Sequence, residues 1–167
     1  MPKSKLLRLA VATAALALVA GCARAPANES AKASDEVKAN MTEMVAAFTA
    51  RDADKAVSWD APNFVGMFHG TPNITGQDAD RALTKQQVDD PAMKFSVSDV
   101  VVDAAASGDL AVWRAAYSYT YTDPVSKKPR TEVGNWVVGW KRQADGKMKE
   151  AWGVVSDTPA APAPPPA

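Results

Sequence analysis

The fold is decided by residues 110–122, which read LAVWRAAYSYTYT. Side chains alternate between the two faces of a β-strand, so Trp113, Ala115, Tyr117, Tyr119 and Tyr121 share one face. Aromatic residues are enriched in strands because they pack well on a pleated, half-buried surface. This stretch therefore predicts a long strand whose aromatic face packs against another layer of the protein.

The flanking segments predict a sheet around this strand. Residues 95–102 alternate in the same way, and Ser107-Gly108-Asp109 predicts a turn between the two strands. After a loop rich in breakers at 123–129, residues 133–142 place Trp136, Val138 and Trp140 on one face. Residues 144–147 predict a hairpin turn, and 148–156 predict a last strand that contains Trp152. Together these segments predict four consecutive antiparallel strands.

The residues before this sheet are predicted to be mainly helical. Apolar residues recur at helical spacing over 35–50, a short helix is expected from Asp52 to near Trp59, and a third is expected over 78–88. Between the last two lie a short strand at 64–69 and a turn at 70–73. The order indicates an α+β fold, with three helices packed on one face of a curved, mainly antiparallel sheet.

The N-terminus has the pattern of a secretory signal over residues 1–21. Lys3, Lys5 and Arg8 precede an apolar run that ends near Leu18, and small residues follow it. The run is shorter than the about 20 apolar residues that a spanning helix needs. The sequence therefore predicts a removed signal peptide rather than a membrane span.

The end of this signal, Leu18-Val19-Ala20-Gly21-Cys22, resembles the lipobox of bacterial lipoproteins. The resemblance implies that the mature chain begins at Cys22, which is lipidated and holds the protein to a membrane by its acyl chains. Ala23, where Asp would favour the inner membrane, implies the periplasmic face of the outer membrane. The alternative is an ordinary cleaved signal followed by a free thiol.

Composition divides the rest of the chain and excludes several kinds of function. Residues 22–34 predict a flexible tether, 35–157 a single domain, and 158–167 a disordered Pro/Ala-rich tail. Without residues 1–21 the chain has 16 basic and 19 acidic residues, which argues against nucleic acid. Cys22 is the only cysteine, and no phosphate loop or paired-histidine motif is visible, so we expect no cofactor and no metal.

The segment 48–57, which reads FTARDADKAV, resembles the opening of the nuclear transport factor 2-like superfamily. Asn73-Ile74-Thr75-Gly76 is similar to the loop that precedes the third helix in that family. The resemblance covers about residues 36–157 and is greatest to the SnoaL-like and ketosteroid-isomerase-like branches. It implies a cone-shaped half-barrel, with a ligand cavity lined by the first helix, the first strand and the concave face of the sheet.

The acid–base residues of the steroid isomerases do not carry over to this chain. Those enzymes use an Asp base together with a Tyr and a protonated Asp. The matching positions fall near Met44, near Met67 and near Val137 or Val138, and these side chains cannot transfer protons. A shift of two residues would bring His69 to the position of the base.

Several residues are candidates for a ligand site, and each has a plainer interpretation. His69 is the only histidine and could act as a base, or it could be a surface residue beside Gly70. Asp60 is most simply a turn residue before Pro62. Aromatic side chains on sheet faces usually form core or cross-strand pairs, but here they could line a ligand cavity. The candidate ligand-binding residues are Trp59, Met67, His69, Tyr117, Tyr119, Trp136 and Trp152.

Three hypotheses for the function follow. The first is an envelope lipoprotein with a non-catalytic domain that binds a small apolar ligand or a protein partner. The second is an isomerase, cyclase or dehydratase that uses His69 as a base, together with Asp60 or Tyr119. The third is an interaction module that forms a homodimer through the exposed face of its sheet.

Overall fold

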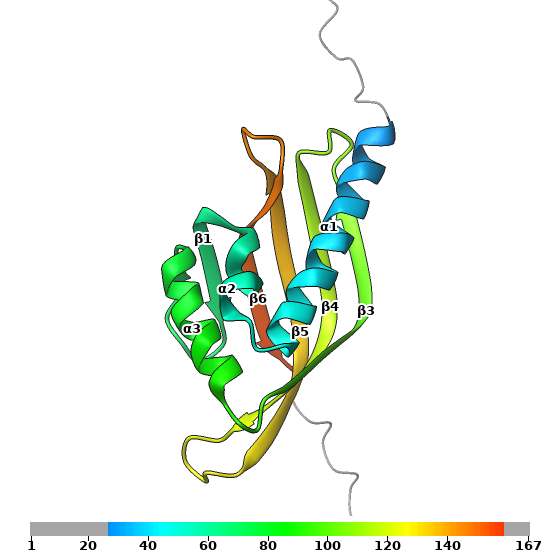
Figure 1. Cartoon of the computed structure of the whole chain (residues 1–167). Helices are drawn as coiled ribbons and strands as arrows, with labels where there is room; N and C mark the ends of the chain where they lie inside the picture. Colours follow the sequence, from blue (N-terminus) through cyan, green and yellow to red (C-terminus); the bar gives the residue numbers. More distant parts are fainter. Residues whose placement is uncertain (1–26, 159–167) are drawn as a thin grey trace, which may run out of the picture.

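The computed structural model describes residues 27–158 and confirms the predicted α+β fold. Its six-stranded sheet has the order β2-β1-β6-β5-β4-β3 and is antiparallel except where β1 runs parallel to β6. Three helices lie on one face of this sheet (Figure 1). The helices are α1 (Ala27–Thr49), α2 (Ala53–Ala56) and α3 (Gln77–Asp89), and a 3-10 turn, η1 (Val57–Trp59), follows α2. The strands are β1 (Asp60–Phe68), β2 (Ile74–Thr75), β3 (Lys94–Ala104), β4 (Leu110–Thr122), β5 (Pro129–Arg142) and β6 (Met148–Asp157).

The main core lies between α1 and the sheet. Val37 and Met41 are at most 1% exposed, and they pack against Trp113 and Trp140 of β4 and β5. Trp113 belongs to the predicted aromatic face of β4, and Tyr117 on the same face is also buried. The alternation that predicted this strand therefore matches the face that packs on α1.

Helix α1 begins at Ala27, earlier than the predicted start at Asp35. The expected tether, residues 22–34, is therefore helical from Ala27 onward, while Cys22 to Pro26 lie outside the described residues. Ser30 Oγ donates a hydrogen bond to the carbonyl of Ala104 at 3.0 Å, and Ala33 is fully buried. Small residues without apolar periodicity resemble a linker in sequence, but Ala has the highest helix propensity, and here it fits close to β3.

Strand β1 also begins earlier than predicted. The sequence indicated a turn at Asp60 and a strand from Phe64, whereas β1 includes Asp60 and Pro62. Pro62 is exposed and lies in the irregular stretch between Asp60 and Val65, where the pairing of β1 with β6 shifts register. A proline is tolerated in a strand where its missing N–H removes no ladder hydrogen bond. No described helix is both long and apolar enough to cross a membrane.

Candidate active site

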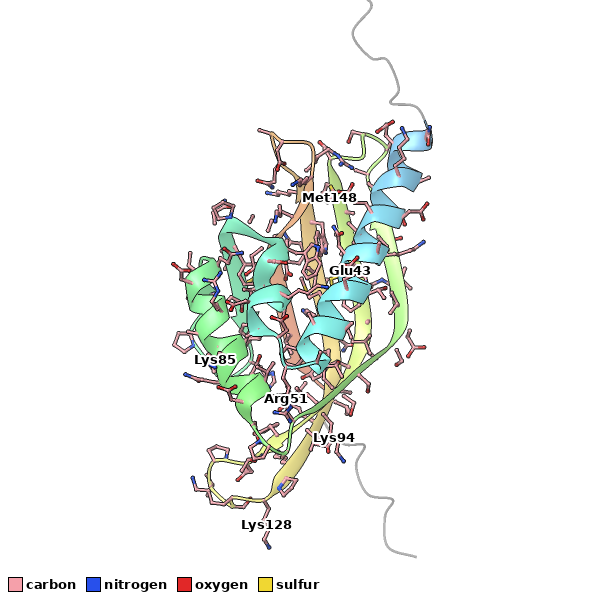
Figure 2. All side chains as sticks on the ribbon, viewed as in Figure 1. Glu43, Arg51, Lys85, Lys94, Lys128 and Met148 are labelled. Atoms are coloured by element: carbon pink, nitrogen blue, oxygen red, sulfur yellow. The ribbon has the colours of Figure 1, made fainter. Side chains whose placement is uncertain are left out.

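A cavity of about 830 Å³ lies between the helices and the inner face of the sheet. Its wall is mainly apolar and aromatic, and includes Phe48, Phe64, Phe95, Tyr119 and Trp136. At the open end the lining residues are exposed, as at Thr71, Pro72 and Pro124, whereas Asp60 and Glu150 at the inner end are buried. The β4–β5 connection marks the open end, and Figure 2 shows its Lys128 far from Met148, the first residue of β6. The cavity thus has the size and lining of a small-molecule site.

Three carboxyl groups meet at the inner end, and we call Asp60, Asp80 and Glu150 the carboxyl cluster. Asp60 is the first residue of β1 and is in register with Glu150 of β6. Asp80 lies in the first turn of α3, which packs on β1. Asp60 is 5% exposed and Glu150 is 4% exposed. Carboxylates are almost never buried to this degree unless they are paired.

The three carboxyls of the cluster have different pKa values, so near neutral pH some hold a proton and one is ionised. Burial raises the pKa of Asp60 to about 8, and the negative charge of Asp80 and a hydrogen bond to Asp80 contribute to this rise. Burial raises the pKa of Asp80 to about 6, and the hydrogen bond from Asp60 opposes part of the rise. Burial also raises the pKa of Glu150, as do the charges of Asp60 and Asp80. Near neutral pH, Asp60 therefore keeps its proton and donates it to the ionised Asp80.

A second polar group, which we call the histidine cluster, lies toward the open end and consists of His69, Glu132 and Tyr117. His69 follows the last residue of β1, and its Nε2 lies 3.3 Å from Glu132 Oε1. Tyr117 donates a hydrogen bond of 2.7 Å to the same oxygen. Burial and this bond to Glu132 raise the pKa of Tyr117, so its hydroxyl stays protonated. The cavity therefore has polar groups at both ends and an apolar middle.

The structure brings four of the seven candidate ligand residues to the cavity: His69, Tyr117, Tyr119 and Trp136. Trp59 is partly buried and packs against the main core instead. Met67 and Trp152 line a depression on the outer face of the sheet and not the cavity.

Strand geometry explains why Met67 and Trp152 face away from the cavity. Phe64 and Phe68 of β1 face the cavity, and alternation then turns Met67 outward. In β6 the register shifts between the pairs Gly139–Trp152 and Trp140–Glu150. This bulge leaves Glu150 and Trp152 on opposite faces although they are two residues apart. The indole of Trp152 then lies over Gly139, where a Cβ would collide with it.

A comparison with protein-family models decides the family. Residues 41–151 match the model described as the SnoaL-like domain. The chain belongs to this family. The SnoaL-like domain thus includes α1 from Met41, the whole of α3 and the carboxyl cluster. No curated protein matches the chain.

Solved structures resemble the SnoaL-like domain at low sequence identity. A candidate dehydratase of the nuclear transport factor 2-like family from Streptomyces avermitilis is 15% identical, with a TM-score of 0.64, over 78% of this chain and 99% of its own. A nuclear transport factor 2-like protein of unknown function from Pseudomonas putida is 22% identical, with a TM-score of 0.63, over 76% and 87%. A ketosteroid isomerase-like protein from Erwinia carotovora is 19% identical, with a TM-score of 0.61, over 76% and 97%. At these identities the comparisons show the fold alone.

Sequence reasoning missed most of the carboxyl groups of the site. Asp60 was interpreted mainly as a turn residue and was named as a partner of His69 only in the second hypothesis. Neither Asp80, Glu132 nor Glu150 was singled out. One signal was present, because a regular strand over 148–156 would place Glu150 on the same face as Met148 and Trp152. An acidic residue among core positions predicts a buried carboxyl with a special role.

Proposed function

We propose that this protein is an acid–base enzyme of the isomerase or dehydratase type, which acts on a small, largely apolar molecule in the cavity. The observation that carries this proposal is the pair of Asp60 and Asp80 at the inner end. The raised pKa values of about 8 and about 6 lie on either side of neutral pH. An efficient general acid and general base have pKa values close to the working pH.

The two carboxyl groups can divide a proton transfer between them. The Asp80 carboxylate accepts a proton from a carbon atom next to a carbonyl group, and the protonated Asp60 donates its own proton to the carbonyl oxygen. The C–H bond breaks, an O–H bond forms, and the substrate becomes an enol. In an isomerisation, Asp80 gives its proton to another carbon of the conjugated enol, and the enol hydroxyl returns its proton to Asp60 as the carbonyl forms again. In a dehydration, Asp80 gives its proton to a hydroxyl on the β-carbon, which leaves as water while the enol hydroxyl returns its proton to Asp60.

The neighbouring groups support this division of roles. Glu150, kept neutral by burial, can donate a hydrogen bond to an oxygen of the substrate. His69 is 40% exposed and is held by Glu132 at the open end, so it suits the orientation of the far end of a ligand better than proton abstraction at the inner end. Purely passive binding explains the apolar wall but not two buried carboxyls beside a partly buried third.

The cellular setting is part of the proposal. We infer from the lipobox-like stretch that Cys22 anchors the enzyme to the periplasmic face of a bacterial outer membrane. A homodimer through the outer face of the sheet stays a prediction, which light scattering on the fragment from Ala23 onward tests.

Deuterium exchange tests the proposed chemistry without knowledge of the natural substrate. The purified protein is incubated in D₂O with small enolisable ketones, including β-tetralone and cyclic enones, and α-proton loss is followed by NMR. We expect exchange that falls by about 10²–10⁴-fold in Asp80→Asn, because an amide cannot accept the proton. Asp78→Asn is the matched control, since this side chain of α3 is 99% exposed.

Exchange that is absent with every ketone, or unchanged in Asp80→Asn, would disprove the acid–base assignment. Thermal melting of both variants is measured alongside, so that loss of folding is recognised. Loss of exchange in His69→Ala but not in Asp80→Asn would instead favour the histidine as base.

A further inference from the structure

We propose that the molecule bound in the cavity carries one basic nitrogen, and that its ammonium group binds in the carboxyl cluster. The inference rests on the proposed function, because it names a substrate class for the same site. It starts from the charges that line the cavity. Among the described lining residues there are five carboxyl groups and neither Lys nor Arg, and His69 is the one basic side chain. The carboxyl residues are Asp60, Asp80, Asp90, Glu132 and Glu150.

The basic side chains next to the cluster are bound elsewhere. Arg81, beside Asp80 in the sequence, pairs through Nε with Asp54 at 2.9 Å and through its guanidinium with Asp78 at 2.6 Å. Lys149, beside Glu150, donates to the carbonyl of Ser58 at 2.7 Å. Their charges lower the pKa of Asp60, but neither occupies the cavity.

The buried acceptor that lacks a donor belongs to the carboxyl cluster. Asp90 accepts bonds of 2.6 and 2.7 Å from the backbone N–H and the hydroxyl of Thr122. Glu132 accepts the bond from Tyr117. By contrast, within the described part of the chain no N–H or O–H group donates to Oδ2 of Asp60, although this side chain is 5% exposed and lines the cavity. A buried acceptor without a donor is costly unless a ligand supplies one.

The charge and shape of this end fit a primary or secondary ammonium ion. With Asp80 ionised and the other two carboxyls protonated near neutral pH, the cluster carries one negative charge. A single ammonium neutralises that charge, and it supplies the N–H donor that Asp60 Oδ2 lacks.

Space and aromatic groups lie beside these carboxyls. A Cβ on Gly153 would stand 3.0 Å from Glu150 Oε1, 3.7 Å from Trp136 Nε1 and 3.8 Å from a ring carbon of Phe64. Gly153, which lines the cavity, therefore brings its backbone close to a carboxyl and two aromatic rings, where a larger side chain would be crowded. The geometry therefore favours an amine with an apolar body over a neutral or acidic ligand.

The test compares ligands that differ in one group. Calorimetry measures the binding of phenylpropylamine, phenylbutylamine and phenylpentylamine to the purified protein near pH 7.5, each beside its alcohol. We expect at least one amine to bind at least tenfold more tightly than its alcohol, which corresponds to about 1.4 kcal/mol. Asp80→Asn should remove this preference, whereas Asp78→Asn should retain it.

The outcomes distinguish this inference from the proposed function. If no amine binds more tightly than its alcohol, or if Asp80→Asn keeps the preference while it melts like the wild type, the inference is wrong. If Asp80→Asn does not fold, Glu150→Gln replaces it, and a preference that is not weakened again overturns the inference. If the protein exchanges the α-protons of neutral ketones but shows no preference for amines, the inference is wrong and the proposed acid–base function stands. If it prefers amines but exchanges no α-protons, the ammonium site stands and the proposed function is wrong.

Discussion

Asp60 shows how strongly the role of one residue depends on its surroundings. In the sequence it precedes Ala61 and Pro62, which is typical of a turn. In the structure it begins β1 in register with Glu150 and faces Asp80, so it becomes a carboxyl that holds its proton at neutral pH. Local composition could not reveal this, because α3 and β6, which bring the other two carboxyls, are distant in sequence.

The pH dependence of exchange follows from the two raised pKa values. Asp80 must be ionised to accept a proton, so activity should rise as the pH increases through about 6. Asp60 must be protonated to donate, so activity should fall as the pH increases through about 8. We expect a bell-shaped profile of kcat/KM. Because the two carboxyls are coupled, the two apparent pKa values of this profile describe the pair as a whole. A profile that stays flat from pH 5 to pH 9 would contradict this assignment.

The same burial should reduce stability at alkaline pH. Asp60 has a pKa of about 8 in the folded state and about 4 when unfolded, so between these values the folded state holds a proton that the unfolded state has released. Raising the pH through this range therefore favours unfolding. We expect Asp60→Asn to be more stable than the wild type near pH 9, by on the order of 1–3 kcal/mol, and the gain to vanish near pH 4.

Urea denaturation across the pH range measures this difference. Asp78→Asn, again the exposed control, should show no such gain in stability between pH 4 and pH 9. A destabilised Asp60→Asn at pH 9 would show that the carboxyl contributes a favourable interaction and not a cost.

At the scale of elements, the start of α1 allows a direct test. Residues 27–34 were expected to be a tether, yet Ser30 and Ala33 contact the domain. A chain that starts at Asp35 should therefore be less stable than one that starts at Ala27, by about 1–3 kcal/mol, because it loses a hydrogen bond and buried contacts. Denaturation of the two fragments decides this, and equal stability would mean that this part of α1 does not contribute.

Elements with strong periodicity were predictable, and those defined by irregular backbone were not. The alternation in 110–122 predicted β4 and its buried face, since Trp113 and Tyr117 are buried as expected. The bulge in β6 leaves no mark in the hydrophobic pattern, so Trp152 was placed in the cavity and Glu150 was overlooked. The carboxyl cluster, apart from Asp60, therefore escaped sequence reasoning, while the aromatic wall around Trp136 and Tyr119 did not.

At the scale of the whole molecule, Cys22 carries the prediction about location. Replacement by Ser should abolish lipidation, because a hydroxyl cannot form the thioether, and the signal should remain uncleaved. Detergent partitioning and intact mass of the wild type and Cys22→Ser measure this. A wild-type protein without acyl chains, or one that partitions into the aqueous phase, would overturn the proposed anchoring and leave the description of the cavity unchanged.

The position of α1 has a consequence for how a ligand would reach the cavity. Its N-terminal end lies beside the β3–β4 turn, where Ser30 contacts Ala104, and its C-terminal end borders the cavity through Phe48 (Figure 1). The helix is about 35 Å long for its 23 residues, and four residues separate it from Cys22. Under the proposed attachment, the end of α1 nearest the membrane lies opposite the cavity entrance, so the entrance would face away from the bilayer that holds Cys22. Substrates would then arrive from the periplasmic fluid instead of by lateral diffusion out of the anchoring membrane.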